Sequence, residues 1–382
     1  MKKLITPGLI GVVILGLLLT SCSPGSAPTP VPATPTTVKT TIPTSNLSLP
    51  TSQDAAWTKV MEAAKQEGSL TIYSITLTGD MSIAVSKAFK DSTGLALDVI
   101  SGRGAAFIER IKTEMRLRQL VGDIMESSVQ HDLTLKSAGG TTGTLDIPVL
   151  REKAVWRVNP LSSDSEGHLM NHKSYYLSPW VNTNLIKPGQ EPKSYRDLAK
   201  PEWKGKIIMS DPSVSGSGYD VFVTMVNRGY LDNDFVKAFG GQGIKFASGT
   251  LDVVRALAKG DESFGFAATD SDASTFLAEG APIKAIAMEE GTLATPSAMT
   301  RVKNGPHPNA AKVFLNWILG PEGQTVFSKG GSLASVRIDV KDFRHPAAAV
   351  EPKRLVVYTG EDAERVAKAF QDKWLVELWK KK

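Results

Sequence analysis

The sequence predicts an α/β fold, and three observations support that prediction. Short apolar runs such as Leu70–Tyr73 alternate with longer segments in which apolar residues recur every three or four positions, the spacing of amphipathic helices. Glycine, serine and threonine are concentrated in the turns between these segments. About 330 residues follow the first fifty, and because a single core of ordinary size rarely holds so many, we expect two domains.

The elements of the first half follow from this periodicity. The first expected helix covers 54–67, where Trp57, Val60 and Ala64 share one face and Gly68 ends the helix. Strands are expected over 70–73, 95–100 and 123–125, and helices over 82–90 and 107–115.

The second half continues the alternation of strands and helices. Strands are expected over 175–182, 206–209 and 264–268, and helices over 217–227, 308–319 and 361–380. The last of these helices carries Val366, Phe370 and Trp374 on one side, and its terminal lysines suit the negative end of the helix dipole.

The first 22 residues have the pattern of a secretory signal. Lys2 and Lys3 precede an apolar run from Leu9 to Leu19, which is shorter than the roughly 20 residues that a membrane-spanning helix needs. Leu19-Thr20-Ser21-Cys22 then resembles the lipobox of bacterial lipoproteins. That resemblance implies a signal peptide of residues 1–21 and a lipid on Cys22, whereas a plain signal or an anchor helix is the alternative interpretation.

Residues 22–51 are expected to form an extended tether. Between residues 23 and 50 there are seven prolines, seven threonines and four serines, with Lys39 as the only charged residue. Such a composition buries too little apolar surface to fold, and its prolines keep it extended. We therefore expect an exported protein whose folded part begins near Ser52 and is held at the outer face of a membrane by the lipid on Cys22.

Composition narrows the classes of function. Cys22 is the only cysteine, so disulfides, thiolate metal sites and a cysteine nucleophile are excluded for the folded part. Removal of the signal takes away Lys2 and Lys3, which lowers a net charge that is only +5. No basic run with interleaved aromatic residues is present, so we do not expect a nucleic-acid partner.

Two further classes of function are weighed as alternatives. The sequence contains no G-x-S-x-G elbow, Walker A loop or H-E-x-x-H motif, so we do not expect an enzyme. The Thr/Pro-rich tether would also suit a structural or adhesive surface lipoprotein. The ordered α/β pattern and the absence of internal repeats argue against that alternative.

Several segments match one known family in their order and spacing from Trp57 to about Lys329. They include 63–73, Gly102-Arg103-Gly104, 181–183, 194–198, Pro201-Glu202-Trp203-Lys204-Gly205, 211–212, Pro306-His307-Pro308-Asn309 and 321–324. In these segments the chain resembles the bacterial extracellular solute-binding proteins, the capture subunits of ABC importers. The most similar branch is the one that includes ferric-iron and phosphonate binders.

The resemblance implies a type II periplasmic-binding-protein fold, in which two α/β lobes close on a ligand around hinge strands. By analogy lobe 1 comprises 52–175 and 292–335, and lobe 2 comprises 176–291 and 336–382. It also implies a lipid-anchored monomer that binds a small solute without a cofactor and delivers it to the permease subunits of an importer.

Candidate ligand contacts lie where strands end and helices begin, because the exposed N–H groups of such turns suit anions. Five turns rich in serine, threonine and glycine qualify, namely 74–78, 101–104, 126–128, 213–218 and 269–271. The predicted contacts are Ser74, Thr76, Arg103, Gly104, Ser127, Ser128, Ser213, Ser215, Ser217, Thr269 and Asp270.

Each of these predictions has an alternative. Serine and glycine turns often only cap helices. Arg103 could hold a carboxylate or phosphate with two hydrogen bonds, or it could be a solvated loop arginine. Asp270 could meet a cation or a hydroxyl-rich ligand, or it could cap the helix that follows. We expect a small oxyanion such as a phosphonate or carboxylate because of Arg103 and the amide-rich turns.

Ferric iron is the second expectation for the solute. Iron binders of this branch commonly carry two adjacent tyrosines at the places of Asp270 and Ser271, and often a histidine at about Leu77. Neither replacement suits Fe(III), so we predict no metal site of the usual kind. Tyr175 and Tyr176 form a pair, but they lie by the expected hinge strand and are interpreted mainly as packing residues.

Overall fold

The computed structural model describes residues 51–143, 145–212 and 217–380. Residues Leu49–Lys382 form one compact unit, in which helices surround a ten-stranded sheet. The predicted signal, Cys22 and nearly all of the tether lie outside the described residues, as do Ser213 and Ser215. Among the described residues, no helix combines the length and the apolar character needed to cross a membrane.

The strands and helices alternate along the chain as the sequence predicts. The strands are β1 (Ser69–Ser74), β2 (Ala96–Ser101), β3 (Ile124–Ser128), β4 (Leu169–Asn182), β5 (Ile207–Ser210), β6 (Lys245–Ala247), β7 (Phe264–Thr269), β8 (Ile283–Ala285), β9 (Thr292–Arg301) and β10 (Leu355–Val357). The α-helices are α1 (Thr51–Glu67), α2 (Gly79–Thr93), α3 (Gly104–Leu117), α4 (Val129–Ser137), α5 (Ser217–Asn227), α6 (Asn233–Gly240), α7 (Thr250–Lys259), α8 (Asp270–Ala278), α9 (Pro308–Leu319), α10 (Pro321–Gly331), α11 (Gly360–Gln371) and α12 (Trp374–Lys380). Short 3₁₀ helices cover Pro148–Arg151, Lys153–Val155, Tyr195–Ala199 and Pro201–Trp203.

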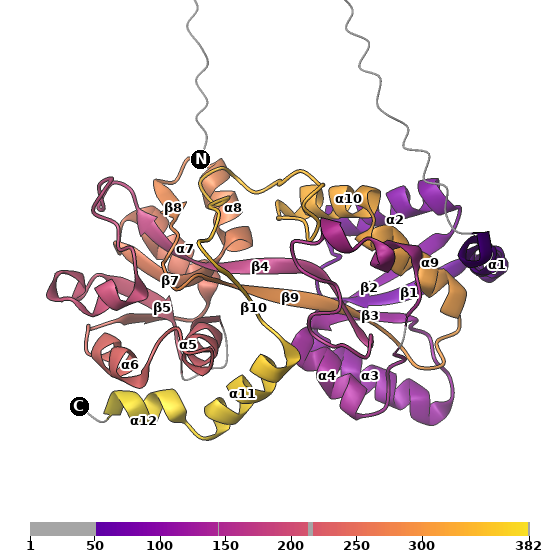
Figure 1. Cartoon of the computed structure of the whole chain (residues 1–382), viewed down its shortest axis with the longest axis horizontal. Helices are drawn as coiled ribbons and strands as arrows, with labels where there is room; N and C mark the ends of the chain where they lie inside the picture. The colour runs from indigo at the N-terminus through magenta and orange to yellow at the C-terminus, as the bar shows by residue number, and fades with distance from the viewer. Residues whose placement is uncertain (1–50, 144, 213–216, 381–382) are drawn as a thin grey trace, which may run out of the picture. The chain divides into compact units, whose positions relative to one another are not determined.

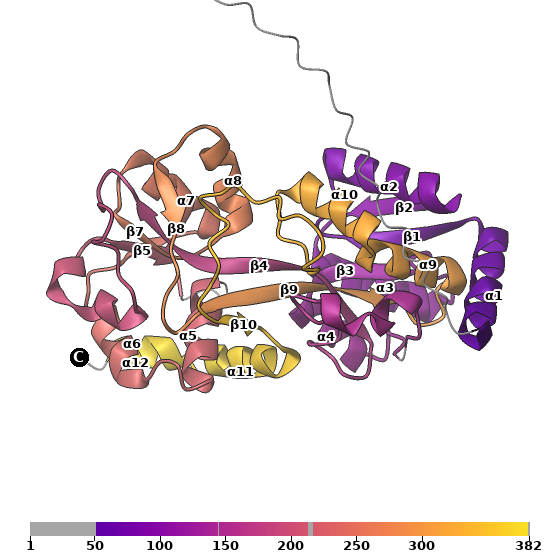
Figure 2. The ribbon, with the colours of Figure 1, turned by 45° about the horizontal axis from the view of Figure 1, so that its top comes forward.

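The sheet has the strand order β2-β1-β3-β9-β4-β7-β5-β6, with β10 paired to β9 and β8 paired to β4. The long strands β4 and β9 are antiparallel and run through the centre of the molecule, where Tyr175 lies opposite Thr295. Strands β1 to β3 lie on one side of this ribbon and strands β5 to β7 on the other, and each group is surrounded by its own helices (Figures 1 and 2). The molecule is therefore a two-lobed α/β fold, which confirms the predicted fold class.

Each group of strands has its own hydrophobic core. In the first, Phe89 of α2 packs edge-on against Phe314 and Trp317 of α9, with ring centroids 5.2 and 5.4 Å apart. In the second, Phe222 of α5 stacks on Phe266 of β7 at 4.6 Å. A fully buried phenylalanine stabilises a fold by roughly 1.5–3 kcal/mol, so these aromatic clusters fix the helices firmly against the sheet.

Local capping explains how distant segments are held together. Helix α9 begins with Pro308, whose lack of an N–H group suits the first turn. The carboxylate of Glu67, at the end of α1, accepts hydrogen bonds from the backbone N–H groups of Asn309 and Ala310 at 3.0 and 2.7 Å. Because first-turn N–H groups lack partners within their own helix, Glu67 satisfies them and ties α1 to α9.

The single helix predicted over 361–380 is wrong, because the structure divides it into α11 and α12. The chain turns at Lys373, which has a left-handed backbone with φ of 53°. The turn lets α12 pack against α6, where the indole N–H of Trp379 donates to the carbonyl of Val236 at 2.9 Å. Strand β4 also begins at Leu169, six residues before the predicted strand.

Candidate functional site

A cavity of about 550 Å³ lies where the first turns of α4 and α5 meet β9 and α11. It is lined by Ser128, Val129, Gln130, His131, Asp220, Thr295, Tyr358, Ala363, Val366, Ala367, Phe370 and Gln371. The cavity therefore combines a turn at the end of β3, the first turn of a helix from the other group of strands, and the central ribbon. Its volume is in the range of small-molecule sites, which is roughly 300–1,000 Å³.

Of the predicted residues, Ser128 lines this cavity, and Ser127 and Gly104 lie next to its wall, against His131. The hydroxyls of Ser127 and Ser128 lie 3.1 and 2.9 Å from Nδ1 of His131, which follows in the first turn of α4. Gly104, at the start of α3, approaches the same group so closely that a Cβ at this position would clash with Ser127 and His131. Glycine at position 104 is thus required by the packing of α3 against the α4 turn.

The electrostatics of this wall favour a hydrogen-bonding site without a fixed charge. Burial lowers the pKa of His131, so its imidazole is neutral near pH 7. The two serine hydroxyls face Nδ1, and each can donate to this nitrogen or accept from it, depending on the tautomer of the ring. Ser128 is the N-cap of α4 but makes no side-chain capping bond, which leaves the first N–H groups of the helix available to other acceptors.

Asp220 contributes to the lining from the first turn of α5. Burial raises the pKa of its carboxyl group to about 7, so the carboxyl is about half protonated in neutral solution. Among the described residues, none makes a hydrogen bond or ion pair with Asp220. Its carboxyl can therefore donate a hydrogen bond when protonated or carry a charge when not.

Two predicted residues instead surround a buried carboxylate. Glu126 is fully buried and accepts hydrogen bonds from the hydroxyls of Ser74 and Thr76 at 2.7 and 2.8 Å, and from the N–H groups of Ile75 and Thr76. The ammonium of Lys173, on β4, lies 3.4 Å from Glu126 and also donates to the hydroxyls of Thr76 and Tyr175. Ser74 and Thr76 thus hold the β1–α2 turn onto β3 and β4.

The groups of this buried cluster shift one another's pKa values. Burial alone would raise the pKa of Glu126, but Lys173, His172 and the two hydroxyls lower it below its ordinary value. Burial lowers the pKa of His172 to about 3. The neighbouring Asp132 has its pKa raised well above the ordinary range by burial and by Glu126. The ion pair between Glu126 and Lys173 is therefore the centre of this cluster.

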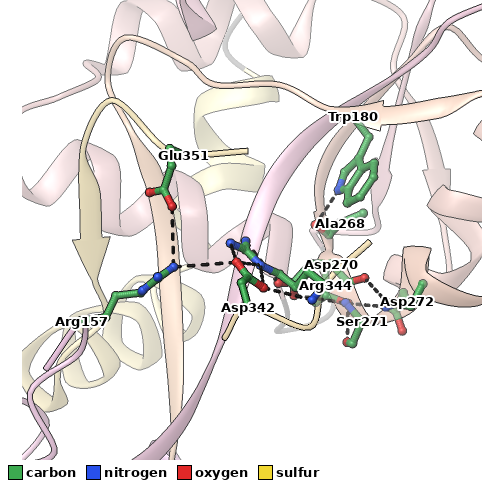
Figure 3. A network of polar contacts seen from close by, with 11 residues as sticks. Arg157, Trp180, Ala268, Asp270, Ser271, Asp272, Asp342, Arg344 and Glu351 are labelled. Carbon is green, nitrogen blue, oxygen red and sulfur yellow. Dashed lines mark hydrogen bonds and ion pairs between the residues drawn. The ribbon is translucent and has the colours of Figure 1, made fainter. Parts of the chain in front are cut away.

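A second polar network surrounds the N-terminus of α8 (Figure 3). Asp270 is buried, and its Oδ2 lies 3.7 Å from Nη1 of Arg344. Arg344 also binds Asp342 through Nη2 at 2.6 Å, and Asp342 and Glu351 lie 3.9 and 3.7 Å from the guanidinium of Arg157. Burial raises the pKa of Asp270 to about 7 even though Arg344 lowers it.

The structure gives the local contacts of Asp270 and of the tyrosine pair, for which the sequence left alternatives open. The cap of α8 is Thr269, whose hydroxyl accepts a hydrogen bond from the N–H of Asp272 at 3.1 Å, so Asp270 is not the capping residue. Tyr176 is buried beneath the guanidinium of Arg344, 4.5 Å from its ring centre, and Tyr175 holds Lys173.

The remaining predicted residues are separate from these groups. Arg103 is exposed at the N-cap of α3 and is not among the residues that line the cavity. Ser217 is the first residue of α5, one turn before Asp220. Sequence reasoning missed His131, Lys173, Asp220 and Arg344. Only His131 had a local signal, because a polar residue three positions after an N-cap serine faces back toward that serine.

Comparison with known proteins identifies the family. Residues 70–332 match the family model described as "Bacterial extracellular solute-binding protein". This chain belongs to that family. The resemblance inferred from the sequence is thereby confirmed, and the family consists of extracytoplasmic binding proteins rather than enzymes.

Individual relatives of this solute-binding protein are distant. It is 23% identical over 354 residues to an uncharacterized protein of Haemophilus influenzae, which covers 87% of this chain and 96% of the relative. A Trichodesmium protein (IdiA, FutA) in complex with iron and citrate has a TM-score of 0.67, with 21% identity over 81% of this chain and 98% of its own. AfuA from Actinobacillus pleuropneumoniae with bound fructose-6-phosphate has a TM-score of 0.60, with 19% identity over 82% of this chain and 99% of its own. At these identities the structures establish the shared fold alone.

Removal of the Lys173 charge tests the buried cluster. We expect Lys173→Met to lower the free energy of unfolding by about 3–5 kcal/mol, because it leaves the carboxylate of Glu126 buried without a cation. The double variant Lys173→Met/Glu126→Gln should recover most of this loss. Urea unfolding measures both, and Lys112→Met on the exposed face of α3 serves as the control, with an expected change within about 0.5 kcal/mol. A loss below about 1 kcal/mol for the single variant would contradict the pairing.

Proposed function

We propose that this solute-binding protein is the capture subunit of an ABC importer and that it binds a small oxyanion, a carboxylate or a phosphonate, in the cavity between α4, α5, β9 and α11. The observation that carries the proposal is the meeting of two helix first turns, of α4 and α5, at one cavity of solute size. N–H groups at helix N-termini attract anions. The hydroxyl of Ser128 and the carboxyl of Asp220 when protonated add donors.

The network at α8 argues against ferric iron at its usual place in this branch. A cation bound at Asp270 would lie beside the guanidinium of Arg344, which is 3.7 Å from that carboxyl and also held by Asp342. The repulsion between two cations in a buried site is large. In the described residues no group of three or more His, Asp or Glu side chains is arranged to hold a metal ion. Iron therefore remains the second candidate, favoured only by the iron-bound structural relatives.

Binding would work by closure around the central ribbon. With lobe 1 as 52–175 and 292–335 and lobe 2 as 176–291 and 336–382, the α4 turn and the α5 turn belong to different lobes. A solute that bridges both turns would stabilise the closed arrangement, which a permease can distinguish from the open one. The solute is bound and released without chemical change.

The lipid anchor is part of the same proposal. We expect the protein to be exported and attached to the membrane through Cys22, with residues up to 51 as the tether. In cells fed a radiolabelled fatty acid, the wild-type protein should become labelled and sediment with membranes. Cys22→Ala should lose the label and should no longer sediment with membranes, whereas Ser23→Ala should behave as wild type. Labelling of Cys22→Ala would contradict this assignment.

A thermal-shift panel on the full-length protein tests the solute class. It covers carboxylates, phosphonates, sugar phosphates, polyamines, sugars and ferric salts. A ligand at about 100 times its dissociation constant should stabilise the protein by about 2.7 kcal/mol. We expect a carboxylate or phosphonate to do so, and Ser128→Ala to reduce its affinity while Ser92→Ala on α2 does not. Stabilisation by ferric salts alone would favour iron instead.

Asp220 predicts the pH dependence of binding. Its pKa of about 7 means that the carboxyl is mostly protonated at pH 6, where it donates to the anion, and mostly charged at pH 8, where it repels the anion. We expect the affinity for acetate, which stays ionised throughout, to fall about tenfold from pH 6 to pH 8 because the protonated fraction falls by that factor.

Burial lowers the pKa of the neighbouring His131 and raises that of Tyr358. Neither group therefore adds a negative charge near the anion between pH 6 and pH 8. Asp220→Asn should therefore bind acetate with almost the same affinity at both pH values, as measured by isothermal titration calorimetry. An affinity that rises with pH would indicate a cationic solute at Asp220.

A further inference from the structure

The cavity has two chemically different walls. Ser128, Gln130, His131, Asp220 and Thr295 form a polar wall contributed by α4, α5 and β9. The rest of the lining is mostly apolar and comes mainly from α11 and the residues before it, namely Tyr358, Ala363, Val366, Ala367 and Phe370, with polar Gln371 at the end of α11 and apolar Val129 on α4. A small hydrated oxyanion has no apolar surface that could pack against these side chains.

The apolar wall is one continuous face of α11. Ala363, Val366, Ala367 and Phe370 are spaced three and four residues apart, so they lie on the same side of the helix. Ala363 and Val366 are buried, Ala367 is half-buried, and Phe370 has 36% of its surface exposed. The opposite side carries Glu364, Arg365 and Lys368, which are exposed. The helix thus turns its apolar side to α4, α5 and the cavity.

This wall is held in place by its own set of interactions. Thr359 and Asp362 form a capping box at the start of α11, and Asp362 also accepts two hydrogen bonds from Arg228, the residue that follows α5, at 3.1 and 2.7 Å. The ring of Phe370 packs edge-on against Tyr219 of α5, with centroids 5.6 Å apart. Because α11 is fixed to α5 by these contacts, its apolar face is a preformed part of the cavity.

Helix α11 lies beyond the segment that the family model matches. The family match ends at residue 332, and α11 begins at Gly360. The helix lies beside α5 and reaches α4 (Figure 1). The polar wall is therefore made by turns inside the matched region, whereas the apolar wall is made by the segment that follows it.

We propose that the solute is amphipathic, with an oxyanion head bound at the polar wall and an apolar body of several carbons packed on α11. This inference rests on the proposed function and names the class of solute for the same cavity. The head would be a carboxylate or a phosphonate, which the two walls do not distinguish. The apolar body accounts for the partly exposed ring of Phe370 and for the small side chains of Ala363 and Ala367, which leave room beside it.

A homologous series of anions tests this inference on the full-length protein. Acetate, butyrate and hexanoate, and methyl-, propyl- and pentylphosphonate, are titrated by calorimetry at pH 6.5. We expect the affinity to increase about fourfold for each added methylene group, as burial of that group predicts. The series with the higher affinity identifies the head.

Variants on α11 locate the apolar body. Ala367→Leu should lower the affinity for hexanoate about tenfold, because the added side chain fills the space, and should leave that for acetate within about twofold. Glu364→Leu, on the exposed side of the same helix, is the matched control and should change neither. Phe370→Ala removes apolar surface instead of adding it and should flatten the dependence on chain length. Thermal melts confirm that each variant is folded.

Two results would overturn the inference, and they can be told apart. An affinity that is the same for acetate and hexanoate would show that α11 does not contact the solute, although the anion site would stand. Binding of a ferric or polyamine probe with no binding of any carboxylate or phosphonate would overturn the proposed function as well.

Discussion

The antiparallel pairing of β4 with β9 is the constraint on which the rest of the structure depends. These strands pair along eight residue positions, from Leu169 opposite Thr300 to Leu177 opposite Leu293. Strand β9 also pairs with β3, and β4 also pairs with β7, so both groups of strands are joined through this ribbon. Thr295 of the ribbon lines the cavity together with residues of the α4 and α5 turns. A shift of one residue in this register would turn the inward side chains of both strands to the opposite face.

The two charged networks join different pairs of segments around this ribbon. Glu126 and Lys173 join β3 to β4 across the intervening β9, and both are almost fully buried. Asp270 and Arg344 join the start of α8 to the segment that follows α10. Buried ion pairs add little net stability, but removal of one partner is costly, so such pairs penalise alternative arrangements more than they favour the native one. We infer that they specify where the turns lie relative to the ribbon.

Local pattern was sufficient to predict much of the fold. The helices α1, α3, α5 and α9 and the strands β1, β2, β3 and β7 follow from apolar spacing and from glycine or proline at their ends. Strand β9 was missed because Pro296 lies at its centre and small residues replace the usual alternation, and a proline ordinarily argues against a central strand. The bend at Lys373 was missed because the apolar spacing continues through it, and only the packing of α12 on α6 requires the turn.

In the candidate site, as in the fold, the features predicted from the sequence are those with a signal in neighbouring residues. The turns at Ser127 and Ser128 were predicted because helix caps have a local signature, but the partners of these turns come from far along the chain. Lys173 reaches Thr76 across 97 residues, and Arg344 reaches Asp270 across 74. No local pattern of charge distinguishes these two residues from solvated lysines and arginines, because what sets them apart is the low-dielectric surroundings that the fold supplies.

The C-terminal segment contributes more to the cavity and to the network at α8 than to the sheet. The segment beyond residue 332 supplies Arg344 to the network at α8 and the α11 face to the cavity, and in its described part, up to residue 380, it contributes only the short strand β10 to the sheet. Substitutions in it can therefore change what the cavity accepts without disturbing the strand pairing on which the two lobes depend. Turns at the ends of core strands can change less freely, since Gly104 and Thr76 are constrained by His131 and Glu126. Under the proposed function, the turns of the core hold the head of the solute, and the terminal segment determines the size and polarity of the solute that fits beside it.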